Sequence, residues 1–288
     1  MIEATLYSDA ACPWAYSESP ALHVIRWRYG DQLDWRLVLI GLTESAEQYV
    51  ARGYTPLRGA HSQLRFRRYG MPFSPQPKER AAATARACRA AVSARLLDPG
   101  SEWRVLRAFQ LANFTTPLLL DDEEGLRGVL RGLQGVDADA ILARLDDPQV
   151  SEAYERDRAE ARTAAGSAAE LQRKTATSDG PVRYTAPSLG LTRNGLSLMA
   201  GGFQPVEAYD ALMANLDPTL ERRPAPETPA PLLEHFGDGL TTQEVAALMT
   251  QGNDAPDRRA AETALLELVA EGAAAREPLG DDALWRAA

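Results

Sequence analysis

The chain has 288 residues, of which 45% are hydrophobic and 25% charged, and its formal net charge is −9. This length allows one large domain or two, and the negative charge argues against a surface that binds nucleic acid or anionic membranes. No apolar run has the length of a membrane span, and the first residues lack the basic and apolar regions of a signal peptide. The two cysteines lie far apart in sequence and do not indicate a disulfide framework, so we expect a cytoplasmic protein with reduced thiols.

A cysteine stands between a strand and a helix near the start of the chain. The residue pattern predicts a strand over Glu3–Tyr7 and a helix over Ser17–Tyr29. Cys12 precedes the helix, and Pro13 suits a first helical turn because its missing N–H would have no partner there. The free N–H groups and the helix dipole favour a thiolate, so Cys12 is a candidate nucleophile with a pKa below about 8.5. A small buried apolar cysteine is the alternative interpretation.

The residues around this cysteine resemble a family motif. Asp9 and the run Cys12-Pro13-Trp14-Ala15-Tyr16 are similar to the Cys-Pro-Trp-Cys-Tyr motif of DsbA-like thioredoxin proteins of the FrnE type. Two related branches, the 2-hydroxychromene-2-carboxylate isomerases and the kappa-class glutathione transferases, carry Ser-Pro-Tyr at this place. The family's second cysteine is Ala15 here, which argues against ordinary dithiol chemistry.

The resemblance covers roughly residues 1–222 and implies an α/β, thioredoxin-like fold with a large helical insertion at about 44–177. It also implies a loop with a cis proline late in the chain. The segment Tyr184–Leu189 matches this loop and places Ala186 before Pro187. We therefore expect the 186–187 peptide bond to be cis and the backbone of Ala186 to pair with a thiol-bearing substrate.

After the first helix, Leu33–Leu42 is predicted to be a second strand, parallel to the first. We interpret 53–77 as irregular, and its Arg65, Arg67 and Arg68 either meet an anionic ligand group or form a solvated basic face; we favour the solvated face. Helices are then predicted over Lys78–Leu97, Glu102–Asn113, Asp122–Gly132, Ala138–Leu145 and Ser151–Gln172.

Cys88 lies inside the first of these predicted helices. It could serve as a resolving thiol for Cys12. We favour an inert packing role, because a cysteine in the middle of a helix lacks the advantage of the helix N-terminus.

The last two strands of the fold are predicted within Pro181–Ala200, as a hairpin turned by Arg193-Asn194-Gly195, since Asn-Gly is a strong hairpin signal. Pro205–Leu216 then reads as the closing helix. In glutathione-binding relatives, the loop that enters this helix holds the γ-glutamyl end of the peptide. Gly202 in that loop could let a ligand approach the backbone, and an ordinary turn is the alternative.

The end of the chain is predicted to be a second unit. Residues 223–234 form a proline-rich linker, and 235–288 show helices followed by a short hairpin, which resembles a winged helix-turn-helix. Residues 235–288 contain ten acidic and four basic residues, a net charge of −6, which contradicts DNA binding. We interpret the unit as a packing or dimerisation module, and a homodimer is one assembly that it allows.

We predict that Cys12 is catalytic and that substrate or thiol contacts come from Pro13, Trp14, Ala186, Pro187 and Gly202, while Tyr16 belongs to the core. His61 and His235 have no metal-ligand spacing, and we expect neither a metal nor a resident cofactor. The predicted function is DsbA-like thiol-disulfide exchange through one cysteine, on a small-molecule or protein disulfide, with glutathione or another small thiol as resolving partner. The alternatives are a glutathione-dependent transferase or isomerase and a non-catalytic thioredoxin-like binding protein.

Overall fold

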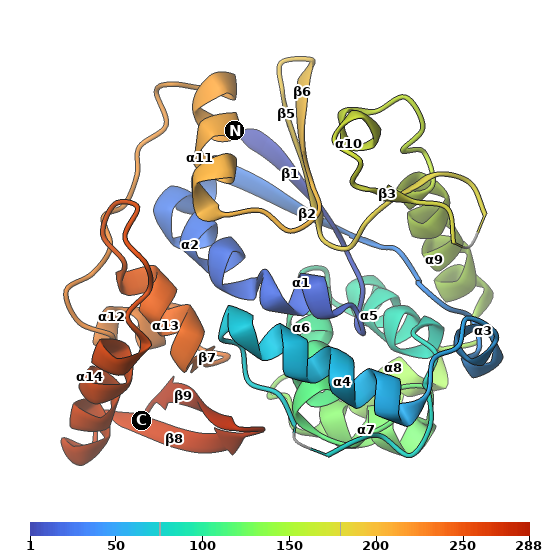
Figure 1. Cartoon of the computed structure of the whole chain (residues 1–288), viewed down its shortest axis with the longest axis horizontal. Coiled ribbons are helices and arrows are strands. Elements are labelled where there is room, and N and C mark those ends of the chain that lie inside the picture. The colour runs from blue at the N-terminus through green and yellow to red at the C-terminus, as the bar shows by residue number, and fades with distance from the viewer. Residues whose placement is uncertain (75, 179) are drawn as a thin grey trace.

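The computed structural model describes residues 1–74, 76–178 and 180–288. Its centre is a four-stranded sheet in the order β2-β1-β5-β6 (Figure 1). β1 pairs in parallel with β2 and antiparallel with β5, which pairs antiparallel with β6. This arrangement confirms the predicted thioredoxin-like α/β fold. The strand bounds are β1 (Ile2–Ser8), β2 (Leu33–Leu39), β5 (Ser188–Arg193) and β6 (Leu196–Gly201).

The predicted hairpin between β5 and β6 is confirmed. Asn194 and Gly195 form its two-residue turn, with φ of 51° and 81°. Positive φ at both central residues is what a tight hairpin turn requires, and asparagine and glycine adopt it at the lowest cost.

The predicted first helix is two helices, α1 (Pro13–Ser17) and α2 (Ser19–Tyr29), separated at Glu18. Pro20 explains the break, because it has no N–H to donate to the carbonyl one helical turn before it. The buried Glu18 carboxylate accepts hydrogen bonds from Tyr209 Oη at 2.8 Å and from the Gln204 backbone N–H at 3.2 Å. These bonds join the helix break to the loop before α11 (Val206–Leu216), and burial raises the pKa of Glu18 to about 8.

The helical insertion differs from prediction in three places. The segment 53–77 is not irregular, since it contains α4, whose N-cap Thr55 Oγ1 accepts a hydrogen bond from the Arg58 N–H at 3.2 Å. The helix predicted from residue 78 begins at residue 85. The helix predicted over 151–172 ends at residue 161, and a separate turn of helix follows Gly166, whose φ is +74°. The bounds are α3 (Ala46–Ala51), α4 (Pro56–Phe66), α5 (Ala85–Leu97), α6 (Ser101–Thr115), α7 (Glu123–Arg131), α8 (Ala138–Ala143), α9 (Pro148–Ala161) and α10 (Ala168–Leu171).

Short elements complete this part of the chain. They are the 3-10 turns η1 (Gly30–Gln32) and η2 (Arg67–Tyr69) and the two-stranded ribbon of β3 (Thr175–Ala176) and β4 (Arg183–Tyr184).

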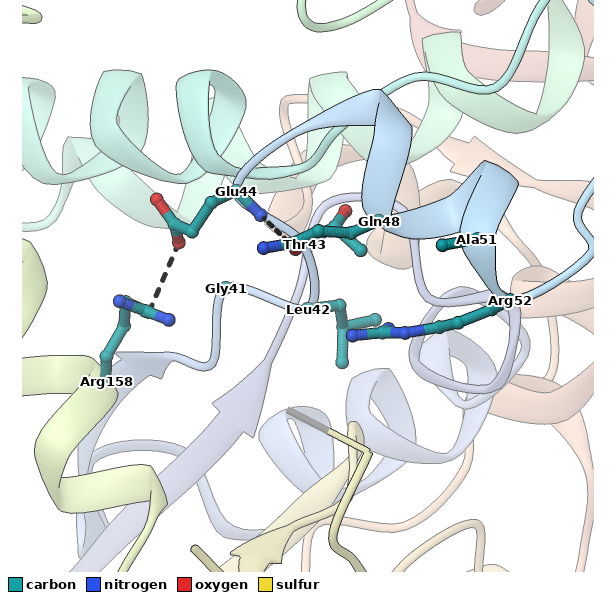
Figure 2. Close-up of a pocket in the computed structure, with 8 residues that line it drawn as sticks. All are labelled: Gly41, Leu42, Thr43, Glu44, Gln48, Ala51, Arg52 and Arg158. Atoms are coloured by element: carbon teal, nitrogen blue, oxygen red, sulfur yellow. Dashed lines mark hydrogen bonds and ion pairs between the residues drawn. The ribbon is translucent and has the colours of Figure 1, made fainter. Parts of the chain in front are cut away.

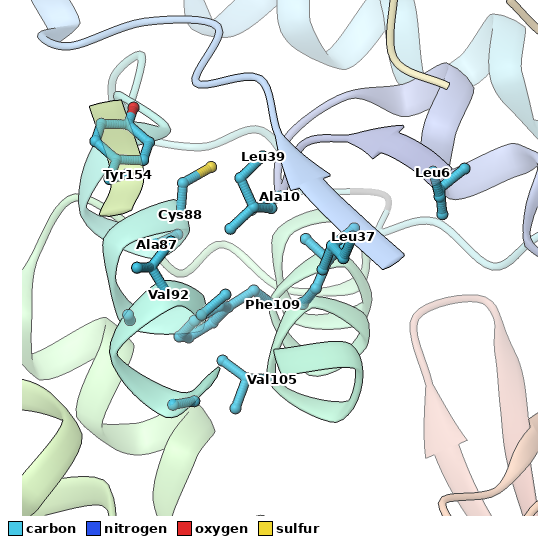
Figure 3. Close-up of a cluster of buried hydrophobic side chains, with 14 of the residues drawn as sticks. Leu6, Ala10, Leu37, Leu39, Ala87, Cys88, Val92, Val105, Phe109 and Tyr154 are labelled. Carbon is cyan, nitrogen blue, oxygen red and sulfur yellow. The ribbon is translucent and has the colours of Figure 1, made fainter. Parts of the chain in front are cut away.

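The main hydrophobic core lies between the sheet and the insertion. Figure 3 shows Cys88 of α5 in this core, among side chains from β1, β2, α6 and α9. Cys88 has no exposed surface, and its Sγ lies 3.6 Å from Asp9 Oδ2. Burial and then the Asp9 carboxylate raise the pKa of Cys88 well above its ordinary value. These surroundings agree with the predicted packing role.

The C-terminal module is a small unit of helices and strands whose sheet has the order β7-β9-β8. A short strand, helices α13 and α14 and a hairpin follow one another, as expected for a winged-helix-like unit. The helix α12 begins at residue 230, inside the segment predicted as linker. The bounds are α12 (Ala230–His235), β7 (Leu240–Thr241), α13 (Thr242–Met249), α14 (Arg258–Ala270), β8 (Ala274–Leu279) and β9 (Asp282–Ala287).

The module packs against the thioredoxin-like part through α13 and α2 (Figure 1). Glu244 of α13 is fully buried there, and its two carboxylate oxygens accept hydrogen bonds from Arg107 Nη1 at 2.6 Å and Nη2 at 2.8 Å. Glu244 also completes a capping box with Thr241. One carboxylate therefore starts a helix of the module and binds the module to α6.

A second set of contacts joins the module to the segment after α4. Arg258 Nη1 donates to the Gly70 carbonyl at 2.5 Å, and Asp281 Oδ1 accepts a hydrogen bond from the Phe73 N–H at 2.7 Å. Arg67, whose role was open, forms an ion pair with Asp281 at 3.0 Å. Gly70 has a φ of +87°, and a Cβ there would lie 2.1 Å from the Gln243 side chain. The module thus fixes the course of residues 67–73.

Acid is expected to weaken the fold through His23 of α2. Burial and, secondarily, the approach of Arg107 lower the pKa of His23 to about 4, against the raising effect of Glu244. Its folded pKa lies below its unfolded value of about 6.5, so stability is complete above pH 6.5 and falls as the pH approaches 4, by up to about 3 kcal/mol. Urea titrations of the wild type and His23→Gln between pH 7 and 4.5 should show the steeper loss in the wild type; equal slopes would contradict this assignment.

Candidate active site at Cys12

The thiol of Cys12 lies at the N-cap of α1 and next to the loop that precedes β5. Its Sγ donates a hydrogen bond to the Ala186 carbonyl at 2.9 Å, although 174 residues separate the two in sequence. The Ala186–Pro187 peptide bond is cis, which confirms the prediction. Cys12 itself is 6% exposed. The fold therefore brings the two predicted halves of the site into direct contact.

The prediction of a lowered pKa for Cys12 is wrong for this structure. Burial raises the pKa of the Cys12 thiol to about 12, the nearby Asp9 carboxylate adds to the rise, and the N–H groups of Ala15 and Trp14 lower it only in part. The helix start supplies the expected N–H groups, but the cost of burying a thiolate exceeds their effect. In this structure, Cys12 is a thiol that donates a hydrogen bond to the Ala186 carbonyl.

Alkylation by iodoacetamide should report this state. Because the resting pKa is raised, the rate at Cys12 is expected to be low at pH 7 and still to rise above pH 9. Cys88, enclosed in the core, is expected to react only after unfolding. Mass spectrometry of peptides after timed labelling measures both rates. A midpoint below pH 8.5 at Cys12, or faster labelling of Cys88, would show that the assignment is wrong.

Asp9 is a positioning residue that sequence reasoning did not include in the site. Its fully buried carboxylate accepts hydrogen bonds from the N–H groups of Ala11 and Leu42, both at 2.9 Å, and from Thr84 Oγ1 at 3.1 Å. It thereby joins the turn that carries Cys12 to the end of β2 and the start of α5. Burial raises the pKa of Asp9, and the N–H donors oppose this rise. The signal was present in the sequence, because Asp9 belongs to the quoted motif.

A cleft of about 620 Å³ opens beside the thiol. Of the residues predicted to contact substrate or thiol, Pro13, Trp14 and Ala186 line it together with Cys12, whereas Pro187 and Gly202 lie outside its lining. The Gly202 N–H donates to Ser188 Oγ at 3.2 Å, and Ser188 has the local structural role expected for it. Gly202 thus bonds to the start of β5 instead of lining the cleft.

Aromatic rings cover one side of this cleft. Trp14 is 40% exposed, and its ring centroid lies 4.8 Å from Phe66, 5.6 Å from Tyr69 and 5.6 Å from Phe203. Phe66 comes from α4, which lies beside α1 (Figure 1). This wall was not predicted, because the pattern of 53–77 indicates an irregular segment. The pair Thr55-Pro56, the N-cap and first residue of α4, was the available signal for a helix start. Tyr16, in contrast, is in the core, as predicted, and is 1% exposed.

The cleft carries positive charge although the chain as a whole is acidic. Five basic residues line it, namely Arg65, Arg68, Lys78, Arg80 and Arg183. None of the described lining residues is acidic. Arg80 forms an ion pair with Asp121 at 2.8 Å, and burial lowers the pKa of Lys78 to about 8. Arg65 and Arg68 border the cleft, so their face is not only the solvated one that we favoured. The cleft therefore favours anionic ligands.

No second thiol stands where the family motif has one. Ala15 is 4% exposed within α1, and both cysteines of the chain are free. Cys88 lies on the other side of Asp9, in the core described above. The arrangement therefore presents one cysteine to the cleft.

A smaller hollow of about 300 Å³ adjoins the cleft at Leu42 (Figure 2). The Glu44 carboxylate lies 3.3 Å from Arg158 Nε, the Glu44 N–H donates to Gln48 Oε1 at 3.0 Å, and Arg52 donates to the Ser178 carbonyl. Its polar groups thus bond with one another, and we assign no ligand to it.

Within the described part of the chain, no group of three or more His, Cys, Asp or Glu side chains is placed to hold a metal ion. None of the described helices combines the length and hydropathy that a membrane span requires.

Comparison with solved structures shows the same fold. A candidate protein disulfide isomerase from Nitrosomonas europaea is 16% identical over 74% of this chain and 96% of its own, with a TM-score of 0.56. The cytosolic disulfide reductase DsbM from Pseudomonas aeruginosa is 19% identical over 74% and 98%, with a TM-score of 0.52. A candidate DsbA oxidoreductase from Streptomyces coelicolor is 18% identical over 76% and 91%, with a TM-score of 0.56.

Sequence comparison gives the family. No curated protein matches the chain. The family model described as the DSBA-like thioredoxin domain matches residues 4–165, which is more than half of the chain. Together with the sheet order, the cysteine at the helix start and the cis proline loop, this match shows that the chain belongs to the DSBA-like thioredoxin domain family.

Proposed function

We propose that the protein is a thiol-disulfide oxidoreductase that works through Cys12 alone and uses glutathione or another small thiol as its resolving partner. The observation that carries this proposal is a single thiol at a basic, aromatic-lined cleft, with Ala15 at the place of the motif's second cysteine. The family acts on thiols and disulfides, and the single-cysteine route is the form of that chemistry that these residues support.

The proposed reaction has two exchange steps. The Cys12 thiolate attacks one sulfur of a disulfide, a mixed disulfide forms, and the other sulfur leaves as a thiolate that takes up a proton. A small thiol then attacks the mixed disulfide and restores Cys12. With a glutathione–peptide mixed disulfide as substrate, Cys12 takes the glutathionyl group and the peptide thiol leaves. One free glutathione then releases this group as oxidised glutathione, so the net reaction consumes one glutathione for each disulfide reduced.

In this proposal, substrate binding favours ionisation of the Cys12 thiol to the thiolate. In the resting site the Ala186 carbonyl oxygen accepts a hydrogen bond from the Cys12 thiol, whose Sγ lies 2.9 Å away. A peptide-like substrate whose N–H pairs with Ala186 would compete for this carbonyl. The thiol then loses the acceptor that favours its protonated form, while the N–H groups of Trp14 and Ala15 continue to favour the thiolate.

The charge of the cleft supports an anionic thiol as the partner. Glutathione carries two carboxylates and one ammonium group at neutral pH, and a cleft with basic side chains and no described acidic lining residue suits that charge. DsbM of Pseudomonas aeruginosa, a cytosolic disulfide reductase, has been solved with GSH. This precedent supports glutathione, and a cytoplasmic location, for the present chain.

A second candidate, a glutathione-dependent transferase or isomerase, rests on the aromatic wall. The rings of Trp14, Phe66 and Tyr69 offer a surface on which an aromatic electrophile could stack beside a bound thiol.

Two assays on the full chain separate the candidates. Reduction of a glutathione–peptide mixed disulfide with glutathione should occur in the wild type, fall at least about 1000-fold in Cys12→Ser, and remain in Cys88→Ser. Conjugation of glutathione to 1-chloro-2,4-dinitrobenzene without disulfide exchange would favour the second candidate. Absence of both activities, with glutathione binding retained or lost, would refute catalysis and leave a binding protein.

A further inference from the structure

A separate cavity lies where the thioredoxin-like part, the insertion and the C-terminal module meet. Its volume is about 230 Å³, and it shares no lining residue with the Cys12 cleft. We propose that this junction cavity binds a small organic carboxylate through Arg26 of α2.

Arg26 is a cation without an acidic partner. Its guanidinium forms no hydrogen bond or ion pair with a side chain or backbone group of the described residues, and it lies over the rings of Trp103, at 4.2 Å, and Trp35, at 4.8 Å. Two tryptophan faces hold the planar group and stabilise its charge, but they satisfy none of its N–H donors. Burial and the nearby Arg107 both lower the pKa of Arg26, to about 10, so it stays charged at neutral pH.

The other charged groups around the cavity are already paired. Arg104 Nε donates to both carboxylate oxygens of Asp238, at 2.8 and 2.9 Å, and Arg107 is bonded to Glu244. His23 is neutral at pH 7, because its pKa is lowered to about 4. The cavity therefore has one uncompensated positive charge, that of Arg26.

The shape and lining of the cavity define the ligand class. A guanidinium offers parallel N–H donors that match the two oxygens of a carboxylate, and this geometry distinguishes a carboxylate from a neutral amide. The large apolar side chains of the lining are Leu6, Leu22, Leu106, Trp103 and Phe236, and the polar side chains of Ser8, Ser19, Gln110 and His235 line it as well. The volume is below that of pockets for drug-sized ligands, so a compact carboxylate with an apolar body fits.

The test is calorimetric titration of the full chain with benzoate and with benzamide, which has the same shape and no charge. We expect saturable benzoate binding with a Kd below about 10 mM, and benzamide binding at least about tenfold weaker. Arg26→Met should weaken benzoate binding at least about tenfold. Two arginine controls should leave it unchanged, Arg68→Gln in the Cys12 cleft and Arg259→Met on the exposed face of α14.

Several outcomes would overturn the proposal. They are equal binding of benzoate and benzamide, unchanged binding in Arg26→Met, loss in Arg68→Gln instead, and no saturable binding up to about 20 mM. If Arg26→Met does not fold by circular dichroism, Arg26→Lys takes its place, because it keeps the charge and loses the paired donors. Wild-type affinity in Arg26→Lys would then refute the carboxylate contact.

Discussion

The substitution Ala15→Cys is expected to give the protein disulfide reductase activity that does not require glutathione. Residue 15 is buried in the first turn of α1, three positions after Cys12, where the motif of the family has its second cysteine. Ala15 also lines the junction cavity, which leaves room for one more sulfur atom. The two thiols can then close on each other after the first exchange step, and insulin reduction with dithiothreitol should rise at least about tenfold.

Two control variants distinguish the effect of the new thiol from the effect of a larger side chain at residue 15. Ala15→Ser adds a group of similar size without a thiol, and it should show no gain. Ala15→Cys combined with Cys12→Ser should also show none, because the new cysteine is too buried to attack a substrate itself. If the wild type already reduces insulin without glutathione, and loses this activity in Cys88→Ser, then Cys88 is the resolving thiol and the single-cysteine proposal fails.

Removal of the Glu244 carboxylate is expected to be the most destabilising single change at the module contact. Glu244→Ala leaves the largely buried Arg107 without its partner, at a cost of about 3–5 kcal/mol in the free energy of unfolding. Although burial alone would raise it, Arg107 and then His23 hold the pKa of Glu244 well below its usual range. The carboxylate therefore stabilises the fold above its unfolded pKa of about 4.5, and this contribution is lost as the pH falls toward the folded value.

Arg104→Ala provides the matched control for this prediction. It removes an ion pair between the same helix, α6, and the same module, but the Arg104 and Asp238 side chains are 36% and 37% exposed. An exposed pair contributes at most about 1 kcal/mol, so urea midpoints should shift far less than in Glu244→Ala. Similar shifts in the two variants would mean that burial of the Glu244–Arg107 pair is not what stabilises the contact.

Local sequence signals predicted the parts of the fold that depend on neighbouring residues. Asn194-Gly195 fixed the hairpin turn, and the strand before Cys12 followed from its apolar pattern. The break at Glu18 and the start of α4 were missed, although Pro20 and the Thr55-Pro56 pair carried the signals. At Glu18 the hydrophobic period of the predicted helix outweighed the signal from Pro20, whereas the segment 53–77 was interpreted as irregular despite the Thr55-Pro56 pair.

The chemistry of the site depended on contacts that sequence spacing does not give. The prediction that Cys12 is a low-pKa thiol used only the helix start, and burial of the thiol, with the nearby Asp9 carboxylate, reverses the direction of the pKa shift. The aromatic wall and the buried Glu244–Arg107 pair each join residues more than 50 positions apart. Nothing near Thr241 in sequence indicates that the glutamate of its capping box also binds α6.

The contacts of the C-terminal module with residues 67–73 affect the order in which the parts of the candidate active site form during synthesis of the protein. The segment that carries Phe66 and Tyr69 leaves the ribosome long before Arg258 and Asp281, which later hold it in place. N-terminal parts of a chain generally fold first during translation. We therefore expect the nascent chain to form its sheet and position its cysteine while one wall of the binding surface is still unfixed, so that selectivity for substrates is acquired only after the module has been synthesised and has folded.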